Sequence, residues 1–260
     1  MESLKMMKER IQALPMEQWE QELPALEKDS RQGVIRFAAS CRKKLAALHD
    51  EQDRVRRMQS FEAELAQGCM FAGIDEAGRG PLAGPVVAAA VIMPPDCPLL
   101  YVNDSKKLSA AKREELFEQI MDVAVSVGVG MASPGRIDEI NILQATYEAM
   151  REAVSGLEPY PDMLVNDAVV IPGLALPQKS VIKGDAKCYS IAAASIIAKV
   201  TRDRIMEQYD SLYPEYGFAG HKGYGSAAHI EALKSYGPCP IHRRSFIGHF
   251  VTGDIIQEDG

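Results

Sequence analysis

Short apolar segments alternate with helical patterns along the chain from residue 69 onward. Five segments predict β-strands through continuous or alternating apolar positions: 70–74, 86–93, 123–131, 163–165 and 178–182. The second, VVAAAVIM, is apolar throughout, which is typical of a strand covered on both faces. We therefore expect this strand in the interior of a sheet.

Helical periodicity fills the intervals between these strands. Helices are expected at about residues 110–121, 134–154, 187–209 and 227–236. Ser109 can cap the first of them, and Pro134 suits the first turn of the second. The order of elements predicts an α/β fold in which helices flank a mixed β-sheet.

Residues 1–68 are rich in Glu, Gln, Lys, Arg, Leu and Met and have few β-branched residues. Apolar positions at helical spacing, broken early by Pro15 and Pro24, predict a small all-helical extension of two or three short helices. Its basic runs at 42–44 and 54–57 fit either a solvated helix face or a phosphate-contacting surface. We expect three parts: this extension, a main domain at 69–248 with a C-terminal helical part, and a tail at 249–260.

Composition narrows the class of protein. The apolar fraction of 47% is ample for a core. No apolar run approaches the length of about 20 residues that spans a bilayer, and the charged N-terminus lacks a signal-peptide apolar region, so we expect a soluble, cytoplasmic protein. The net charge of −7 argues against bulk attraction to nucleic acid but allows a local basic groove. The five cysteines form no CxxC motif, which favours neither a zinc knuckle nor a disulfide framework.

Acidic side chains stand at the ends of three predicted strands: Asp75 and Glu76, Asp167, and Asp185. Strand ends lie beside one another in a sheet, so these carboxylates are expected to converge. Any one of them alone also fits a turn or a helix cap. As a group they would repel one another unless cations intervene, and two Mg²⁺ or Mn²⁺ ions about 4 Å apart are the usual partners. Such a site suits phosphodiester hydrolysis.

The stretch IDEAGRGPLAG, at 74–84, joins the first two acids to a glycine-rich turn. It has three interpretations: a phosphate loop, a metal site or a strand-to-turn junction. No Lys-Ser/Thr pair follows the glycines, which argues against a phosphate loop. A plain junction leaves the adjacent acids unexplained, so the metal site is favoured.

Four stretches of the second part of the chain carry a resemblance to a known family: GIDEAGRGPLAGPVVAAAVI, DSKKLS, IKGDAKCYSIAAASIIAKVTRDR and YPEYGFAGHKGYGSAAHIEALKSYGPCPIHRRSF. They resemble the type 2 ribonucleases H, the bacterial ribonuclease HII family. They stand in the family's order and cover about residues 70–247. The sister class, ribonuclease HIII, typically lacks the arginine that stands here as Arg79 between two glycines, so the resemblance favours ribonuclease HII.

This resemblance implies an RNase H-like fold and a metal-dependent endoribonuclease. It implies hydrolysis of the RNA strand of RNA/DNA hybrids and incision 5′ of single ribonucleotides embedded in duplex DNA, as in ribonucleotide excision repair. The products would carry 3′-hydroxyl and 5′-phosphate ends. The family's four metal-binding carboxylates fall on Asp75, Glu76, Asp167 and Asp185, for two Mg²⁺ or Mn²⁺ ions. A monomer is expected.

The family's substrate contacts carry over by position. Gly78, Arg79 and Gly80 fall on the element that senses the ribose 2′-hydroxyl, the group that distinguishes RNA from DNA. Tyr224 falls on the tyrosine that packs on a deoxyribose at an RNA-to-DNA junction.

Other matched residues have less definite roles. Those expected near the nucleic-acid backbone are Ser105, Lys106 and Lys107. Lys183, Lys199 and Arg202 are expected either to contact phosphate or to hold the carboxylates in place. A structural role is expected for His221, His242, Arg243 and Arg244.

Two features depart from the family pattern, and two rival functions stay open. Asn166 precedes the third acid where many relatives have an apolar residue, and residues 1–68 lie outside the shared core. Some members from Gram-positive bacteria carry a similar extension, so a role in substrate binding is a hypothesis.

The two rival functions are a ribonuclease HIII-like enzyme that is poor at single ribonucleotides, and a nucleic-acid- or protein-binding module with a vestigial site.

Overall fold

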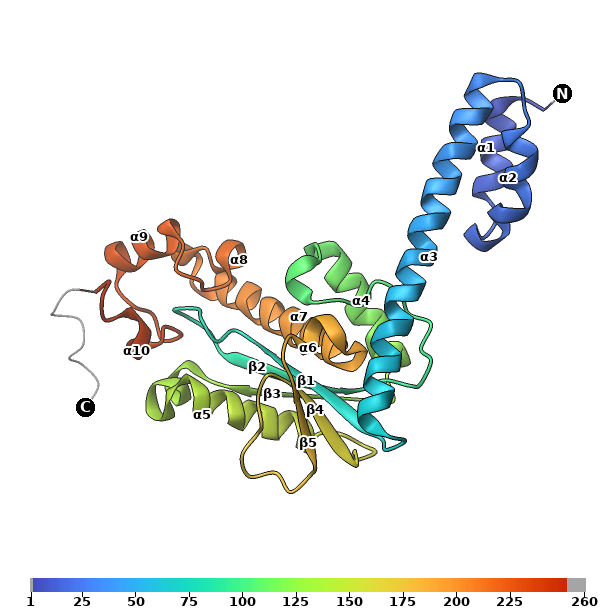
Figure 1. The fold of residues 1–260 in the computed structure, drawn as a ribbon. Helices are drawn as coiled ribbons and strands as arrows, with labels where there is room; N and C mark the ends of the chain where they lie inside the picture. Colours follow the sequence, from blue (N-terminus) through green and yellow to red (C-terminus); the bar gives the residue numbers. More distant parts are fainter. Residues whose placement is uncertain (1, 252–260) are drawn as a thin grey trace. The chain divides into compact units, whose positions relative to one another are not determined.

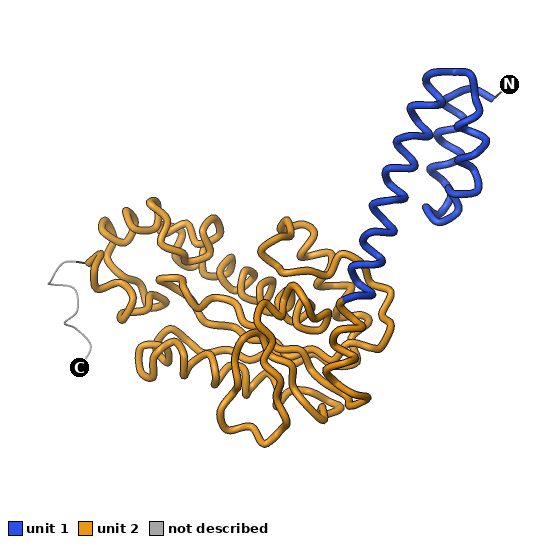
Figure 2. The backbone as a smooth tube through the Cα atoms, in the orientation of Figure 1, with its two compact units in different colours: residues 1–57 blue, residues 58–260 orange. Residues whose placement is uncertain are grey.

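The computed structural model describes residues 2–251 and divides into two compact units, residues 1–57 and 58–260 (Figure 2). Most of the tail expected at 249–260 lies outside the described residues. Among the helices that are described, none combines the length and apolarity that a membrane crossing requires.

The N-terminal unit is helical. It contains α1 (Leu4–Gln12), the 3-10 helix η1 (Met16–Gln18), α2 (Trp19–Glu27) and most of α3 (Gln32–Ala66). These helices share an apolar core that includes Ile11, Trp19, Leu23, Phe37 and Leu45. The helical extension is confirmed, but the expectation of short helices is wrong for α3, which has 35 residues. Residues 34–67 contain neither glycine nor proline, so nothing interrupts the helix.

The second unit is built on a mixed sheet with strand order β3-β2-β1-β4-β5, five strands within the described residues (Figure 1). The strands are β1 (Phe71–Ala77), β2 (Val86–Ile92), β3 (Ser126–Ala132), β4 (Met163–Asp167) and β5 (Gln178–Val181). β2 pairs antiparallel with β1 and β3, whereas β1, β4 and β5 run parallel. The predicted α/β fold with a mixed sheet is therefore confirmed.

Helices cover both faces of this sheet. They and the short 3-10 helices are η2 (Ser105–Lys107), α4 (Ala110–Val123), α5 (Pro134–Ser155), α6 (Gly184–Lys187), α7 (Tyr189–Leu212), η3 (Pro214–Tyr216), α8 (Phe218–His221), α9 (Ala227–Tyr236) and α10 (Arg244–Ile247). In Figure 1, α5 and α7 lie on opposite sides of the strands. All seven residues of β2 are buried, which confirms that it is an interior strand.

Several boundaries differ from the prediction by a few residues, and two of these differences have a plain physical reason. β1 continues through the two acids to Ala77, because Glu76 and Ala77 still pair with Ala88 and Val87 of β2. β3 begins at Ser126 rather than at Val123, because α4 uses Val123 for its last turn. Asp75 and Glu76 therefore lie within a strand, where their positions are fixed by sheet pairing.

Candidate active site

Three aspartates from neighbouring elements meet at one edge of the sheet. β1 and β4 are parallel neighbours with Ile74 beside Asn166, so Asp75 and Asp167, one position further along, lie next to each other. Asp185 stands in the first turn of α6, just after β5. One carboxylate oxygen from each of the three aspartates lies within 4.8 Å of the other two. The convergence expected from the strand ends is thus present for these residues.

Glu76, the fourth acid of the predicted set, lies beside this group rather than within it. Its Oε1 accepts a hydrogen bond from Nη1 of Arg79 at 3.3 Å. Burial raises the pKa of Glu76, the charge of Arg79 opposes this rise, and the charge of Asp167 adds to it. Glu76 is therefore close enough to Asp167 to interact with it, while its hydrogen bond faces Arg79.

Asp75 has the most unfavourable environment for a negative charge. Its side chain is buried, and burial together with the charge of Glu76 raises its pKa well above the ordinary range. A hydrogen bond from its neighbour's backbone N–H to Oδ1 (2.8 Å) acts in the opposite direction. Burial by itself lowers the pKa of Lys106, yet the charges of Asp75, Asp104 and Asp185 raise it overall, which places this cation beside the cluster.

The donor set of the cluster fits a hard divalent cation. It consists of carboxylate oxygens, the ligands that Mg²⁺ and Mn²⁺ prefer, and the oxygens are close enough to share an ion. Lys106 acts on Asp75 and Asp185, and Lys107 also acts on Asp185. The three aspartates with Glu76 beside them still leave an excess of negative charge for cations to balance. The residues present therefore fit the metal that the carboxylates led us to expect.

Ser105 has a structural contact here. It is buried, and its hydroxyl lies 2.9 Å from the hydroxyl of Ser195 on α7. The guanidinium of Arg113 donates to the backbone oxygens of Ser105 and Leu108, at 3.0 and 2.6 Å. Ser195 also hydrogen-bonds Asp75. Ser105 is thus linked through Ser195 to the aspartate cluster, whereas the next residue, Lys106, is exposed.

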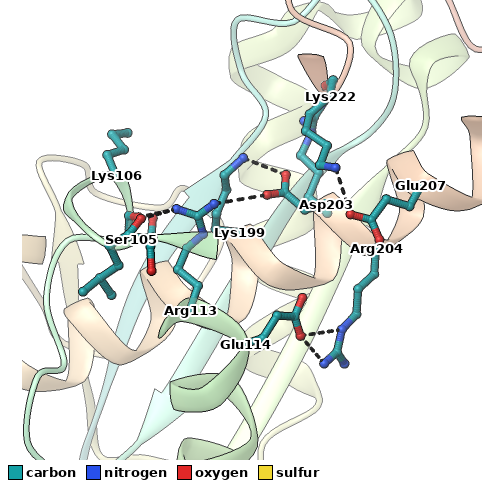
Figure 3. Close-up of polar contacts among 12 residues, drawn as sticks. Ser105, Lys106, Arg113, Glu114, Lys199, Asp203, Arg204, Glu207 and Lys222 are labelled. Atoms are coloured by element: carbon teal, nitrogen blue, oxygen red, sulfur yellow. Dashed lines mark hydrogen bonds and ion pairs between the residues drawn. The ribbon is translucent and has the colours of Figure 1, made fainter. Parts of the chain in front are cut away.

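Lys199 does not touch the carboxylate cluster. Its ammonium lies 2.6 Å from Asp203, which Arg113 also approaches at 3.8 Å (Figure 3). Lys222 makes a similar pair with Glu207 at 2.9 Å. These residues line an open pocket between α4, α7 and α8 in which each lysine already faces a carboxylate. The expectation that Lys199 holds the metal-binding carboxylates is therefore wrong.

The glycine loop, defined as residues 78–85, is held from below by a buried arginine. Arg243 donates to the carbonyl oxygens of Gly78 (2.6 Å), Arg79 (3.0 Å) and Gly84 (2.9 Å). Gly78 has φ +92°, a conformation that side-chain-bearing residues rarely adopt. The structural role expected for Arg243 agrees with these contacts. Arg79 itself keeps 45% of its side chain exposed.

The tyrosine loop, defined as residues 222–225, lies against the glycine loop. The side chain of Tyr224 is exposed, and a Cβ placed on Gly80 would be 3.9 Å from its ring. The backbone N–H of Leu82 donates to the carbonyl oxygen of Gly223 at 2.8 Å. Two elements far apart in the sequence, both predicted to read the sugar, are therefore neighbours in the structure.

Two buried histidines fix the backbone beneath Tyr224. The backbone N–H of Cys239 donates to Nδ1 of His242 (3.0 Å), so the ring proton of a neutral His242 is on Nε2. Nε2 of His242 then donates to Nε2 of His229 (3.0 Å), and Nδ1 of His229 donates to the carbonyl oxygen of Tyr224 (2.9 Å). His221 stacks on His229, with ring centres 4.4 Å apart. The contacts agree with the structural role expected for His221 and His242; the sequence did not single out His229.

This chain of hydrogen bonds predicts a loss of stability in acid. Burial lowers the pKa of His242 from 6.5 to about 4, so its contribution to stability is present above pH 6.5 and is lost as the pH falls toward 4. We expect His242→Gln to reduce the difference in unfolding free energy between pH 7 and pH 4.5 by up to about 3 kcal/mol. Urea unfolding at both pH values measures this, with His249→Gln, at an exposed histidine, as the control. Equal pH slopes for His242→Gln and the native protein would contradict it.

Glu62 is a structural residue that sequence reasoning missed. It lies near the end of α3, is 6% exposed, and accepts a hydrogen bond from the backbone N–H of Ser190 (2.8 Å) in the first turn of α7. Burial raises its pKa to about 7. Because Cys188 offers no side-chain cap, Glu62 satisfies an N-terminal amide of α7. A single glutamate in a helix gives no signal of this, since its partner is 128 positions away.

The side-chain nitrogen of Asn166 hydrogen-bonds residues other than the aspartates. Its Nδ2 donates to Oε1 of Gln178 (2.8 Å) and to the carbonyl oxygen of Val169 (3.3 Å). Ile74, its partner on β1, packs in the core on the α5 side. Successive side chains of a strand alternate between faces, so Asp167 lies on the opposite face.

The side chain of Lys183 is exposed, and its backbone has the left-handed conformation (φ 57°) just before α6.

The chain matches known proteins along most of its length. The family model described as "Ribonuclease HII" matches residues 72–249, and the model "Ribonuclease HII N-terminal domain" matches residues 3–66. A ribonuclease HII of Lachnoclostridium phytofermentans is 58% identical over 86% of this chain and 88% of its own length. A ribonuclease HII of Clostridioides difficile is 50% identical over 96% of this chain and 98% of its own.

A solved structure shows the same fold. The crystal structure of ribonuclease H2 from Pyrococcus horikoshii is 34% identical, with a TM-score of 0.56, and the match covers 67% of this chain and 92% of that one. The family model alone matches well over half of the chain, and the curated relatives match along almost all of it. The chain therefore belongs to the ribonuclease HII family and is an endoribonuclease of the ribonuclease H type.

Proposed function

We propose that this endoribonuclease hydrolyses the RNA strand of RNA/DNA hybrids and also incises 5′ of single ribonucleotides embedded in duplex DNA. The observation that carries the proposal is the meeting of Asp75, Asp167 and Asp185 next to the glycine loop. The products would carry 3′-hydroxyl and 5′-phosphate ends. We place the activity in the cytoplasm, in ribonucleotide excision repair.

We assign the cluster to two divalent ions, Mg²⁺ or Mn²⁺. When bound, such ions lower the pKa of a water molecule and stabilise the leaving oxygen of a phosphodiester. Asp75, Asp167 and Asp185 would hold them, and Glu76 would become the fourth ligand by exchanging its contact with Arg79. Hydrolysis by this means needs no nucleophilic side chain.

The two loops are assigned to the reading of the sugar. Gly78, Arg79 and Gly80 would face the 2′-hydroxyl, and the exposed ring of Tyr224 would pack on the next deoxyribose. Lys106, beside the cluster, is the assigned contact to the nucleic-acid backbone nearest the ions. Lys183 would add a second backbone contact, and Ser105 would act by holding this segment in place.

Cleavage of two matched duplexes tests the proposed function. One is an RNA/DNA hybrid and the other is DNA of the same sequence, both with Mg²⁺ or Mn²⁺ and with EDTA as the control. We expect cleavage of the RNA strand alone, and only with the metal. Cleavage of the all-DNA duplex at a similar rate would contradict the recognition of ribose.

We further propose that the N-terminal unit contributes to binding of the duplex. Residues 1–57 contain 12 basic and 10 acidic residues, whereas the whole chain has 29 and 36, so the excess of negative charge lies in the second unit. Deletion of residues 1–57 should raise KM about three- to tenfold, with kcat within about twofold of the native value. Steady-state kinetics on the hybrid measures this, and an unchanged KM would remove the proposal.

The deletion must end at residue 57, because the rest of α3 belongs to the second unit. The last turns of α3 belong to the second unit, where Gln59 donates to the carbonyl oxygen of Cys97 (2.8 Å) and Lys179 donates to that of Leu65 (2.6 Å). Deletion of residues 1–68 would remove these contacts and the hydrogen bond of Glu62 to Ser190. The longer deletion should therefore lower stability, which makes it a control for loss of fold rather than a test of binding.

A further inference from the structure

One buried side chain connects the glycine loop to the tyrosine loop. Arg202, on α7, donates from Nε to the carbonyl oxygen of Pro85 (2.9 Å) and from Nη2 to that of Ala83 (3.1 Å). Its remaining nitrogen, Nη1, donates to the carbonyl oxygen of Lys222 (2.9 Å). Two bonds therefore go to the first loop and one to the second. Because the Arg202 side chain is buried, it cannot reach a phosphate, and its donors bind backbone carbonyl groups rather than the carboxylates. Both expected roles are therefore wrong.

The position of Arg202 is tightly constrained. It is 1% exposed, and among the described residues no carboxylate lies within ion-pair distance of it, so backbone carbonyl groups balance its charge. A Cβ on Gly78 would lie 2.0 Å from Arg202 Nε, which means that the glycine loop has room for the guanidinium only because residue 78 is glycine. The guanidinium carbon also lies 5.9 Å from the centre of the Tyr224 ring.

Arg243 provides an internal comparison. It is fully buried and also donates to three backbone carbonyl groups, but all three belong to the glycine loop (Gly78, Arg79 and Gly84). Arg243 thus shapes one loop, whereas Arg202 fixes the position of one loop relative to the other. The planar guanidinium makes this possible because its donors point in fixed directions, which a lysine ammonium does not reproduce.

We infer that Arg202 is a positioning residue that sets the spacing between the Gly-Arg-Gly element and Tyr224. This inference rests on the proposed function, in which the first element senses a ribose and the second packs on the deoxyribose that follows. A single embedded ribonucleotide needs both elements at one spacing. A continuous RNA strand offers no deoxyribose to Tyr224 and depends on the glycine loop alone. Arg202 therefore sets the preference for the junction.

The test uses the full chain and two duplexes, one with a single ribonucleotide and one RNA/DNA hybrid. Arg202→Lys should lower kcat/KM on the single-ribonucleotide duplex at least about tenfold more than on the hybrid. Arg243→Lys, the matched control, should lower both to a similar extent. The ratio of kcat/KM on the single-ribonucleotide duplex to kcat/KM on the hybrid is then measured in a double-mutant cycle. Arg202→Lys should not reduce this ratio further when Tyr224→Ala is already present, because both substitutions act through the same contact.

The outcomes separate this inference from the proposed function. If the native enzyme fails to cut at the single ribonucleotide, the proposed function is wrong, and this appears before any variant is compared. If the native enzyme cuts both duplexes and Arg202→Lys lowers kcat/KM on them equally, as expected for Arg243→Lys, the inference is overturned. Should Arg202→Lys fail to fold, Arg202→Gln, which retains a donor and most of the volume, is measured in its place with the same two outcomes.

Discussion

Replacement of Asp75 by asparagine should lower kcat by a factor of about 10³ or more while leaving the protein folded. Asp75 is the buried member of the cluster, and one of its carboxylate oxygens lies within 4.8 Å of oxygens of both Asp167 and Asp185. Asparagine is almost the same size, and its side-chain oxygen can still accept the backbone N–H of Glu76. The substitution removes the negative charge and little else.

The effect on stability makes this prediction specific. In the absence of metal, Asp75→Asn removes like-charge repulsion, so its melting temperature should equal or exceed that of the native protein. Asp162→Asn is the matched control, because Asp162 also accepts a backbone N–H, that of Met70, before the other end of β1 (2.9 Å). That variant should retain native activity. Near-native turnover of Asp75→Asn would contradict the assignment of the cluster.

Replacement of Gly73 by alanine should destabilise the second unit by about 3 kcal/mol or more, or prevent it from folding. A Cβ at this position would lie 2.3 Å from the backbone carbon of Ser190 and 2.4 Å from the backbone nitrogen of Ile191. Both are backbone atoms of α7, so no rotamer change relieves the overlap, and β1 and α7 must separate. That separation would also move Ser195 on α7 away from Asp75.

The control for this variant is Gly220→Ala in α8. A Cβ on Gly220 meets nothing within 4 Å, so its effect should stay within about 0.5 kcal/mol. Trp19, the single tryptophan, belongs to the N-terminal unit and does not report on this one. Hydrogen exchange of the β1 and α7 amides in urea is the appropriate measurement. A loss below about 1 kcal/mol for Gly73→Ala would show that the packing of α7 on β1 tolerates a methyl group.

The parts of the fold that could be predicted are those with a periodic signal. β2 was recognisable because a run of seven apolar residues is typical of a strand that is buried on both faces. The end of β1 that the sequence predicts is too early, since Asp75 and Glu76 by themselves look like a strand end. Pairing with β2 keeps them in the strand, and pairing is a property of two segments that local polarity does not encode.

The residues of the site also differ in how far the sequence predicts them. The meeting of Asp75, Asp167 and Asp185 could be predicted because the ends of neighbouring strands lie beside one another. The residues that hold the loops and the start of α7 in place could not, because Arg202, Arg243 and Glu62 bind backbone atoms of distant segments. Any residue offers the same backbone atoms, so such partners leave no pattern in the sequence. Only the folded chain shows that Arg202 reaches two loops.

We propose that the aspartate cluster, with the help of divalent ions, and the two loops together direct cleavage next to a ribose. The most direct test is a 5′-labelled DNA duplex with one embedded ribonucleotide, incubated with Mn²⁺ or with EDTA, with the product mapped to the nucleotide. We predict one cut, immediately 5′ of the ribonucleotide and with a 3′-hydroxyl end, in Mn²⁺ alone. A cut that persists in EDTA, or that falls at positions unrelated to the ribonucleotide, would contradict the account.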